Sequence, residues 1–433
     1  MKIIKARASS VLPDLNSAVP FEGRTYSIPY LNIGDEVEFE PKRGWNRVIS
    51  VESAEPDISR CRYFRKCGGC KAQHLEYAEQ FRIKTAPHLE YYLRNFDVSP
   101  ILVPAEVQYR YRNRMDFAVF PEKIGLRQEG NFRNIIDVSS CELQSEEADR
   151  ILSECRNIVP AGLAYDRKKE TGFLKYITLR TDSDRKETMT VFTFTEDFRD
   201  TYEEKLFREK AASISSDSVI FCFNRKKSEV SADGEYSVIK GRSLFTENIL
   251  GKNADIPFNS FFQPNLKGFY PILSFIEKEL LNIEDRKMMA DFFCGTGLFS
   301  IVFAEYFETA VGFDISADSV RLAEQNVIKI YPEKKILFRQ MDLFSIREKI
   351  NSFADISGSA VFLDPPRAGI GTSMADLLLE LKPKHIFYIS CNPYSQETDL
   401  EILKTSYRLK SILITDPYPN TPHLESVAFL ERL

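Results

Sequence analysis

The stretch DFFCGTGLFSIVFAE, residues 291–305, decides the fold of the C-terminal part of the chain. A strand-like segment, 288–293, runs into Gly295 and Gly297, and a helical segment follows them. Glycines at a strand-to-helix turn let the backbone approach a ligand closely, and the helix N-terminus adds backbone donors. The stretch therefore predicts the first strand, the ligand loop and the first helix of an α/β unit.

Strand and helix patterns alternate on both sides of this stretch, from about residue 256 to the end. We expect strands at 288–293, 310–315, 336–341, 360–363, 385–390, 410–415 and 426–430, with helices between them such as 319–331 and 372–381. Such alternation is typical of a doubly wound parallel sheet that binds its ligand at the carboxyl ends of the strands. The fold class predicted for this part is α/β, with seven strands.

The residues before 256 have a different pattern. Short β-rich runs at 25–31, 36–40 and 47–51 fit a small barrel of the OB type. A helical run at 76–96 contains Pro87, which should kink or split it. From 109 to 242 strands dominate, and we expect an antiparallel sheet with strands at 112–120, 124–138, 176–181, 188–194 and 219–223 and helices at 146–158 and 202–213. We therefore expect three domains, 1–56, 57–256 and 257–433.

Acidic residues follow the strands of the C-terminal part. Asp314 ends the second strand, nineteen residues after Gly295, where it can accept hydrogen bonds from ribose hydroxyls. Asp342 ends the third strand. The glycine loop lacks the third glycine of the dinucleotide fingerprint, which favours S-adenosylmethionine over NAD as the ligand.

Two more strand ends carry reactive side chains. The fourth strand ends in DPPR (364–367), where the proline pair indicates a rigid exit from the sheet. The fifth ends in SCNP (390–393), which points the Cys391 thiol into the cleft. A lone thiol is usually an inert core residue, but the neighbouring strand end with Asp364 favours a nucleophile here. Glu425, in HLESV (423–427), comes just before the last strand.

Charge gives a mixed indication about nucleic acid. The net charge is −5, which argues mildly against it. Basic residues nevertheless cluster, at Arg60, Arg62, Arg65, Lys66 and Lys71. Arg110, Arg112 and Arg114 alternate along a predicted strand, which would place three guanidinium groups on one face as a phosphate track.

Eight cysteines without an N-terminal secretory pattern indicate a reducing compartment, and we expect a cytoplasmic protein without disulfides. No run approaches eighteen apolar residues, so no membrane span is expected. Cys155, Cys222 and Cys294 fit the role of small apolar residues. Cys61, Cys67 and Cys70, spaced C-x5-C-x2-C, and the distant Cys141 form a possible ligand set, for which iron–sulfur and zinc are both chemically open.

Seven motifs, in this order, together resemble one family. They are CRYFRKCGGCKAQHLEY (61–77), YRNRMDF (111–117), FFQPN (261–265), DFFCGTG (291–297), DPPRAG (364–369), SCNP and HLESV. The chain resembles the RNA uridine C5-methyltransferases, which form 5-methyluridine in tRNA and in large-subunit ribosomal RNA. Residues 1–55 are similar, more loosely, to the RNA-binding TRAM domain.

The resemblance implies a class I methyltransferase domain and a role for each matched residue. S-adenosylmethionine would be bound by Gln263, Phe293, Asp314, Asp342 and Asp364. Cys391 would be the nucleophile that attacks uracil C6, and Glu425 the base that removes the C5 proton. Cys61, Cys67, Cys70 and Cys141 would hold a 4Fe–4S cluster with a structural role. Asp314 departs from the family, which often has Glu there.

The target uridine must leave its stack, and Phe261, Phe262 or Tyr388 could stack on it, although such aromatics are more often core residues. The TRAM-like region together with the cysteine quartet favours 23S ribosomal RNA as the target, with the T-loop uridine of tRNA as the alternative. We expect a monomer whose partner is RNA. One rival interpretation is amino-group methylation of adenine or cytosine, in which an aromatic residue commonly stands where this chain has Arg367. A second rival is a non-catalytic, RNA-binding iron–sulfur protein.

Overall fold

The computed structural model describes residues 3–43, 45–344, 356–357 and 359–433. Contacts between Cα atoms divide the chain into two compact units. The first unit contains residues 1–86, 107–245 and 418–422, and the second contains 87–106, 246–417 and 423–433. Both units are therefore assembled from segments far apart in the sequence.

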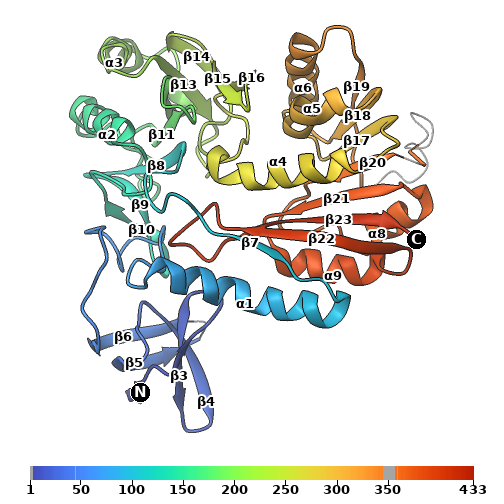
Figure 1. The fold of residues 1–433 in the computed structure, drawn as a ribbon. Coiled ribbons are helices and arrows are strands. Elements are labelled where there is room, and N and C mark those ends of the chain that lie inside the picture. Colours follow the sequence, from blue (N-terminus) through green and yellow to red (C-terminus); the bar gives the residue numbers. More distant parts are fainter. Residues whose placement is uncertain (1–2, 44, 345–355, 358) are drawn as a thin grey trace. The chain divides into compact units, whose positions relative to one another are not determined.

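The second unit is built on an eight-stranded sheet, in the order β19-β18-β17-β20-β21-β23-β22-β7 (Figure 1). Its strands are β7 (Ile101–Val103), β17 (Met288–Phe292), β18 (Thr309–Asp314), β19 (Lys335–Gln340), β20 (Ala360–Leu363), β21 (His385–Ser390), β22 (Tyr407–Thr415) and β23 (Glu425–Arg432). All seven predicted strands are present, which confirms the α/β class. Two features differ from the prediction: β23 runs antiparallel between β21 and β22, and β7 adds an eighth strand beside β22.

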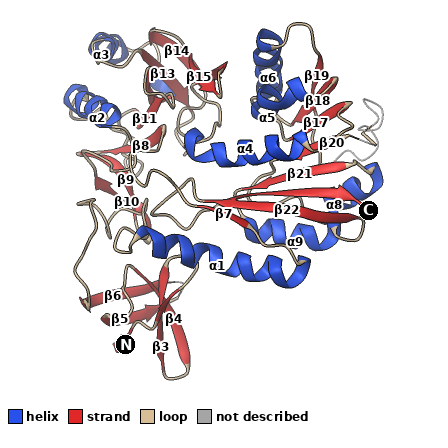
Figure 2. Ribbon diagram, viewed as in Figure 1, coloured by secondary structure: helices blue, strands red, loops and turns tan. Residues whose placement is uncertain are grey.

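Helices lie on both faces of this sheet. They are α4 (Leu266–Leu281), α5 (Leu298–Phe303), α6 (Ala317–Ile330), α8 (Gly371–Leu381) and α9 (Pro393–Leu403), with a short 3-10 turn η2 (Ala304–Tyr306) after α5. Helix α4 packs on β22 and β23, whereas α9 packs on β21 from the opposite side (Figure 2). The buried residues of α4 recur every three or four positions, so one apolar stripe faces the sheet. This packing holds the carboxyl ends of the strands in place.

The first unit contains a seven-stranded sheet, in the order β10-β9-β8-β11-β12-β13-β14. Its strands are β8 (Arg114–Phe120), β9 (Lys123–Gln128), β10 (Asn131–Asp137), β11 (Leu174–Thr181), β12 (Thr188–Thr195), β13 (Ser218–Asn224) and β14 (Glu235–Lys240). The expected antiparallel sheet is wrong at one place, because β12 and β13 pair in parallel. The chain between them includes a 3-10 turn η1 (Glu196–Phe198) and helix α3 (Tyr202–Ala212), a length that allows a parallel crossover.

Local signals account for several boundaries in this sheet. The predicted strand at 124–138 is a hairpin of β9 and β10, because Gly130 takes a left-handed conformation at φ +68°. Helix α2 (Glu146–Ile158) has the predicted bounds, and the Ser145 side chain caps it by accepting from Ala148 N at 3.1 Å. A pair of strands, β15 (Leu244–Ile249) and β16 (Lys252–Pro257), forms a separate two-stranded sheet.

The N-terminal residues form two three-stranded sheets, β1-β5-β6 and β2-β3-β4. The strands are β1 (Ile4–Arg7), β2 (Ser10–Val11), β3 (Asn16–Phe21), β4 (Arg24–Pro29), β5 (Glu36–Lys42) and β6 (Trp45–Glu52). The two sheets share one small core, to which Val19 and Ile28 contribute from one sheet and Val37 and Phe39 from the other. The strand-rich character is confirmed, and a closed OB-type barrel stays a prediction.

Helix α1 (Tyr77–Phe96) runs without interruption through Pro87. The prediction that Pro87 splits this segment is therefore wrong. A proline removes one backbone donor from a helix interior, and the many other hydrogen bonds and the packing of a twenty-residue helix compensate for that loss. The division between the two units falls at Pro87.

Candidate active site and cysteine pocket

The carboxyl ends of the parallel strands bring several predicted site residues to one edge of the second unit. Phe292 pairs with Phe313 and with Leu363, so Phe293, Asp314 and Asp364 follow three neighbouring strands at the same level. Gly297 begins α5 with φ +87°, and a Cβ there would lie 3.0 Å from the Ala323 Cβ of α6. Glycine is thus required both by the backbone and by the close approach of that helix.

Asp314 fixes the glycine loop from the neighbouring strand. Its carboxylate accepts from Gly295 N at 3.0 Å and from Ser316 N at 2.8 Å. Asp342 accepts from the backbone N–H of Phe344 at 3.0 Å, and the Phe344 ring lies 5.4 Å from the ring of Phe293. Asp314 is therefore bonded directly to the glycine loop, and Asp342 holds the turn whose Phe344 ring lies near Phe293.

Asp291 was not among the residues predicted to bind the cofactor, although it belongs to this edge. One oxygen, Oδ2, accepts from the backbone N and the hydroxyl of Ser300, at 3.1 and 2.6 Å. The other, Oδ1, is buried and has no hydrogen-bond partner within the described part of the chain. Burial, with smaller effects of Asp364 and Asp314, raises the pKa of Asp291 to about 7 against the hydrogen bonds from Ser300. An unpartnered buried acceptor fits a polar or cationic ligand group at this edge.

Cys391 and Glu425 come together because β23 runs antiparallel to β21. Ser390 of β21 pairs with Ser426 of β23. Because the two strands run in opposite directions, Cys391, which follows Ser390, lies beside Glu425, which precedes Ser426. The thiol is half-buried, and the Glu425 side chain is buried. The structure thus brings together two predicted catalytic residues that are 34 positions apart in the chain.

The surroundings of Cys391, Glu425 and Asp364 disfavour negative charge. Burial, then Glu425, then Asp364 raise the pKa of Cys391 to about 12, and the Arg367 guanidinium opposes them. Burial and Asp364 also raise the pKa of Glu425, and burial raises that of Asp364 to about 7. Three acids this close do not all ionise at neutral pH. The ligand-free site therefore holds Cys391 as a thiol.

Arg367 is the cation in these surroundings, and sequence reasoning gave it no role. Its guanidinium Nη2 lies 3.1 Å from Nδ1 of His423, and its backbone oxygen accepts from the side chains of Asn392 and Ser395 at 3.1 and 3.2 Å. The signal available in the sequence was its position in DPPR, two residues past the proline that follows Asp364.

The loop after DPPR is held from α9 by the buried Asp399. Its carboxylate accepts from Ile370 N at 2.9 Å, from Gly371 N at 3.0 Å and from the hydroxyl of Tyr388 at 2.6 Å. A Cβ on Gly369, where φ is +81°, would lie 2.4 Å from Asp399 Oδ2. The structure therefore fixes the loop that carries Arg367 against the strand that carries Cys391.

The FFQPN segment lies in the same unit, between β16 and α4. Gln263 and Phe262 are buried, whereas the Phe261 side chain is 75% exposed. Tyr388 is fully buried, and its hydroxyl is used by Asp399. Of the three aromatics considered for stacking on a base, Phe261 alone presents its ring to solvent, and the other two are core residues.

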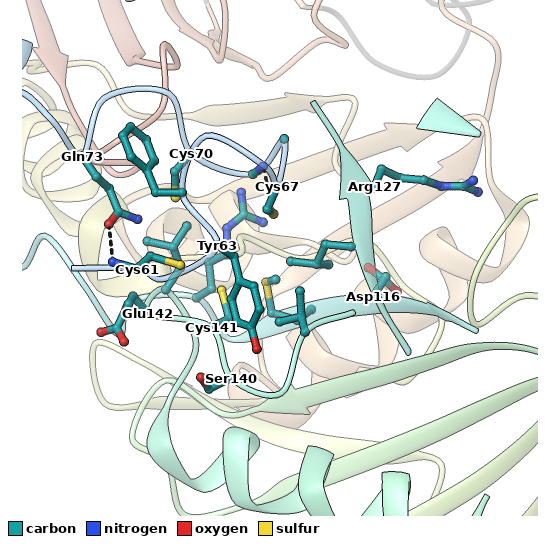
Figure 3. A pocket seen from close by; sticks show the side chains of 18 of the residues that line it. Cys61, Tyr63, Cys67, Cys70, Gln73, Asp116, Arg127, Ser140, Cys141 and Glu142 are labelled. Carbon is teal, nitrogen blue, oxygen red and sulfur yellow. Dashed lines mark hydrogen bonds between the residues drawn. The ribbon is translucent and has the colours of Figure 1, made fainter. Parts of the chain in front are cut away.

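In the first unit, Cys61, Cys67, Cys70 and Cys141 line one cavity of about 320 Å³ (Figure 3). All four are free thiols. Apolar side chains form much of the remaining wall, including Phe64, Met115, Leu126, Val138 and Leu143. The long-range pairing predicted for the quartet is thus present, with three thiols from the loop before α1 and one from the loop before α2.

The thiols are close enough to influence one another. Burial raises the pKa of Cys70 to about 12 and that of Cys141 to about 11, and the neighbouring thiols add to both shifts. Gly69 N donates to the Cys67 sulfur at 3.4 Å. Within the described residues, no group of three or more His, Cys, Asp or Glu side chains is arranged to hold a single metal ion. In a four-iron cluster each thiolate binds a different iron, so four sulfurs around a cavity, rather than at one point, fit such a group.

Two of the three arginines predicted as a phosphate track have carboxylate partners within the protein. Arg110 lies before β8 with φ +58°, and its guanidinium donates to Cys141 O at 2.8 Å and to Asp149 at 2.7 Å. Arg114 forms a two-point ion pair with Asp116, at 3.0 and 3.1 Å. Arg112 lines the cysteine cavity. The expected alternation along one strand is wrong, because β8 begins only at Arg114. Contact of these arginines with phosphates stays a prediction.

The three buried cysteines outside the quartet are confirmed as core residues. Cys155 and Cys222 are fully buried, and Cys294 is nearly so.

Among the described residues, no helix is long and apolar enough to cross a membrane.

Comparison with known proteins gives a consistent result. A family model described as tRNA (uracil-5-)-methyltransferase matches residues 76–433. A protein of Leptospira interrogans serovar Lai, named as an uncharacterized RNA methyltransferase, is 46% identical over 382 residues, which cover 87% of this chain and 84% of that protein. The tRNA (uracil(54)-C(5))-methyltransferase of Pyrococcus horikoshii is 32% identical over 413 residues, which cover 93% of this chain and 95% of that protein.

A solved structure is similar over nearly the whole length. The crystal structure of the Pyrococcus abyssi tRNA (uracil-54, C5)-methyltransferase in complex with S-adenosyl-L-homocysteine matches with a TM-score of 0.77 and 25% sequence identity. The match covers 99% of this chain and 100% of that one. The N-terminal strands and the cysteine loop, which precede the residues matched by the family model, are therefore within the matched part.

Proposed function

The chain belongs to the tRNA (uracil-5-)-methyltransferase family and is an RNA methyltransferase, and we propose that it forms 5-methyluridine through a covalent bond between Cys391 and uracil C6. The observation that carries the proposal is the pairing of β21 with β23, which sets the Cys391 thiol beside the Glu425 carboxyl. A nucleophile and a proton acceptor at adjoining strand ends are the two groups that this chemistry needs from the protein.

The Cys391 thiol first releases its proton to solvent, and the sulfur opens the reaction as a thiolate. The sulfur bonds to C6 of the uracil, the C5–C6 double bond is lost, and the electron pair is delocalised as an enolate onto the C4 oxygen. The enolate makes C5 a nucleophile, which unsubstituted uracil is not. S-adenosylmethionine is the second substrate and supplies an electrophilic methyl group, which C5 takes while the sulfonium sulfur keeps the electron pair of the broken bond.

Glu425 completes the reaction. Its carboxylate takes the proton from C5, the electrons of that C–H bond restore the C5–C6 double bond, and Cys391 leaves as a thiolate. The raised pKa of Glu425 makes it a stronger base once ionised than an exposed glutamate. Arg367 lowers the pKa of both groups and so favours the two anions that the cycle requires.

The residues proposed for the methyl donor come from the strand ends of the second unit and, for Gln263, from the segment before α4. Asp314 would accept from the ribose, Asp342 from the adenine side, and Asp364 and Gln263 would face the methionine end, with Phe293 at the glycine loop. The unpartnered oxygen of Asp291 supports adding this residue to the set. Phe261, exposed beside Gln263, would stack on the flipped uracil.

The four thiols of the cysteine pocket would hold a 4Fe–4S cluster. When bound, the group supplies four metal–thiolate bonds that tie the loop at 61–70 to Cys141, and methyl transfer itself requires no electrons. The cavity, the free thiols and the apolar wall support this assignment.

The target RNA has two candidates. Ribosomal RNA was expected because the chain combines a TRAM-like region with the cysteine quartet. The Pyrococcus abyssi tRNA enzyme matches 99% of this chain, so a protein of this architecture can act on tRNA. This similarity makes uridine 54 of tRNA the second candidate. The chemical reaction would be the same on ribosomal RNA and on tRNA. A monomeric, cytoplasmic enzyme remains our expectation.

One experiment tests the chemistry, and a second identifies the target. Fluorine cannot leave C5 as a cation, so RNA that contains 5-fluorouridine should form a denaturation-resistant complex with the protein, dependent on both S-adenosylmethionine and Cys391. A complex that forms equally with Cys391→Ala would refute Cys391 as the nucleophile. No such complex with the wild type would refute the covalent mechanism and make amino-group methylation the leading hypothesis. Mapping 5-methyluridine in RNA from a deletion strain then distinguishes the two targets: loss from large-subunit ribosomal RNA supports the first, and loss from the tRNA T-loop the second.

A further inference from the structure

The loop that carries Cys141 is fastened by two charged side chains. The backbone N–H of Cys141 donates to Asp149 Oδ1 at 2.8 Å, and its backbone oxygen accepts from Arg110 Nη1 at 2.8 Å. The same two side chains hold Gln144, whose backbone oxygen accepts from Arg110 at 3.1 Å and whose side chain donates to Asp149 Oδ1 at 2.6 Å. Both polar backbone groups of Cys141 are thus bound by side chains.

Arg110 and Asp149 also bind each other, at 2.7 Å between Nη1 and Oδ2. Their side chains are 26% and 15% exposed. The backbone of Arg110 joins the arrangement, because its N–H donates to Glu142 O at 2.8 Å and its oxygen accepts from Arg185. This ion pair is largely enclosed and is supported by hydrogen bonds to backbone groups. It therefore differs from an isolated surface pair, which contributes little to the free energy of folding.

We propose that Arg110 and Asp149 are positioning residues that fix Cys141 as a ligand of the cluster. The inference rests on the cluster assigned under the proposed function. A ligand whose peptide groups are bound on both sides needs little reordering when its sulfur binds iron, and groups that orient a ligand in this way commonly raise metal affinity by about 10–100-fold. The three bonds leave one nitrogen, Nη1, and the second nitrogen, Nη2, lies 3.4 Å from a carboxylate oxygen of Glu142. A lysine keeps the charge but has one nitrogen in place of these two, so Arg110→Lys should weaken the arrangement.

The competing assignment of Arg110 is a phosphate contact. If the guanidinium turned to a phosphate, Asp149 Oδ2, Cys141 O and Gln144 O would each lose the hydrogen bond from Arg110, and of the two carbonyls Cys141 O would keep its bond from Gln144 N. The observed contacts therefore favour the structural assignment, and RNA binding provides the test that separates the two.

The test uses the full-length protein, purified without oxygen. Wild type, Arg110→Lys and Asp149→Asn are compared with Arg150→Lys as the matched control. Arg150 lies on the same helix as Asp149, is 61% exposed and pairs only with Glu147 among the contacts found for its side chain in the described chain. The measured quantities are iron and acid-labile sulfide per chain, and the rate of iron loss to an excess of a ferrous chelator, followed by the visible absorbance of the cluster.

We expect wild type and Arg150→Lys to lose iron at the same rate, and Arg110→Lys and Asp149→Asn to lose it about 10-fold faster or more. Binding of S-adenosylhomocysteine, which depends on the other unit, should stay unchanged in all four and so reports that the second unit is folded. Far-ultraviolet circular dichroism, compared with Arg150→Lys, reports on the first unit as well. If Arg110→Lys is too unstable to purify, Asp149→Asn carries the test, because it keeps the shape of the side chain while it removes the charge and replaces one acceptor oxygen by an amide donor.

Iron loss at the wild-type rate in both variants would overturn the inference. A lowered salt dependence of RNA binding in Arg110→Lys, with normal iron retention, would assign the arginine to a phosphate instead. A wild-type protein that contains no iron and no sulfide when purified without oxygen would instead refute the cluster itself, so the two failures are distinguishable.

Discussion

The molecule uses cysteine in two contrasting settings. In the cysteine pocket, four thiols face one largely apolar cavity and receive hydrogen bonds from their own loops, as Cys67 does from Gly69 N. Cys391 is a single thiol beside two carboxyl groups and an arginine. Burial raises the pKa of the thiols in both places, but the neighbours differ in kind: other sulfurs in one, acids and a cation in the other. The first setting suits shared ligation, and the second suits a thiolate that forms and is released within one turnover.

The strongest test of the difference between the two cysteine settings is to remove the single thiol, Cys391. Cys391→Ala should abolish methylation, with a loss on the order of 10⁴-fold or more, because no other group can bond to C6. Tritium transfer from S-adenosylmethionine to RNA measures it. Iron content and RNA binding should match wild type, and turnover near the wild-type level would rule out the covalent mechanism.

Removing one thiol of the quartet should give the reverse result. Cys141→Ala should lose the cluster and lower the midpoint of thermal unfolding, because the loop at 61–70 is no longer tied to Cys141. Each kcal/mol lost would shift that midpoint by roughly 2–4 °C in a unit of this size. Iron analysis and calorimetry check the prediction, with Cys155→Ala as a control for the removal of a buried thiol outside the pocket. Full iron retention in Cys141→Ala would exclude this residue as a ligand.

Glu425→Gln should separate the two halves of the reaction at Cys391. Attack and methyl transfer remain possible, but the C5 proton cannot be removed, so turnover should fall by about 10²–10⁴-fold. The RNA should remain attached to the protein, carry the methyl group and survive denaturing electrophoresis. The adduct must vanish in the double variant with Cys391→Ala. An adduct-free but inactive Glu425→Gln protein would mean that Glu425 is needed before the bond to C6 forms.

The smallest effect concerns the charge around Cys391 in the ligand-free protein. Burial, then Glu425 and Asp364, raise the pKa of this thiol, so alkylation by iodoacetamide should be slow at pH 7 and accelerate as the pH rises toward about 12. At a pH high enough to ionise Glu425, Glu425→Gln removes one negative charge beside the thiol, lowers the pKa of Cys391 and should speed alkylation. The gain is about threefold for each unit of pKa, since a less basic thiolate is also less nucleophilic.

Arg367→Gln should act in the opposite direction, because the cation that lowers the pKa of Cys391 is lost. Mass spectrometry of the Cys391 peptide measures both rates, and the cysteines of the pocket in the same digest serve as an internal reference. Equal rates in wild type and both variants would mean that the neighbouring charges do not control this thiol.

Local chemistry made much of the fold and of the site predictable. The strands of the second unit follow from their β-rich runs, and the ligand edge follows from the glycine stretch and from acids such as Asp314 and Asp364 at the strand ends. Asp291 was within reach of the same reasoning, since it stands in that stretch, and only its unpartnered oxygen marks it out. The roles of Cys391 and Glu425 came from the resemblance to a family, not from periodicity or spacing.

Sequence by itself therefore determined which residues can do the chemistry and at which end of each strand they stand. Only the tertiary structure decided which side chains lie beside these residues. The antiparallel pairing of β23 brings Glu425 to Cys391, and the buried Asp399 ties the DPPR loop to β21. The guanidinium of Arg110 donates to Cys141 O and to Asp149. The physical reason is that hydrophobic periodicity and turn residues act over a few positions along the chain. Hydrogen bonds, ion pairs and pKa shifts instead depend on distances that exist only once the remote segments have packed together.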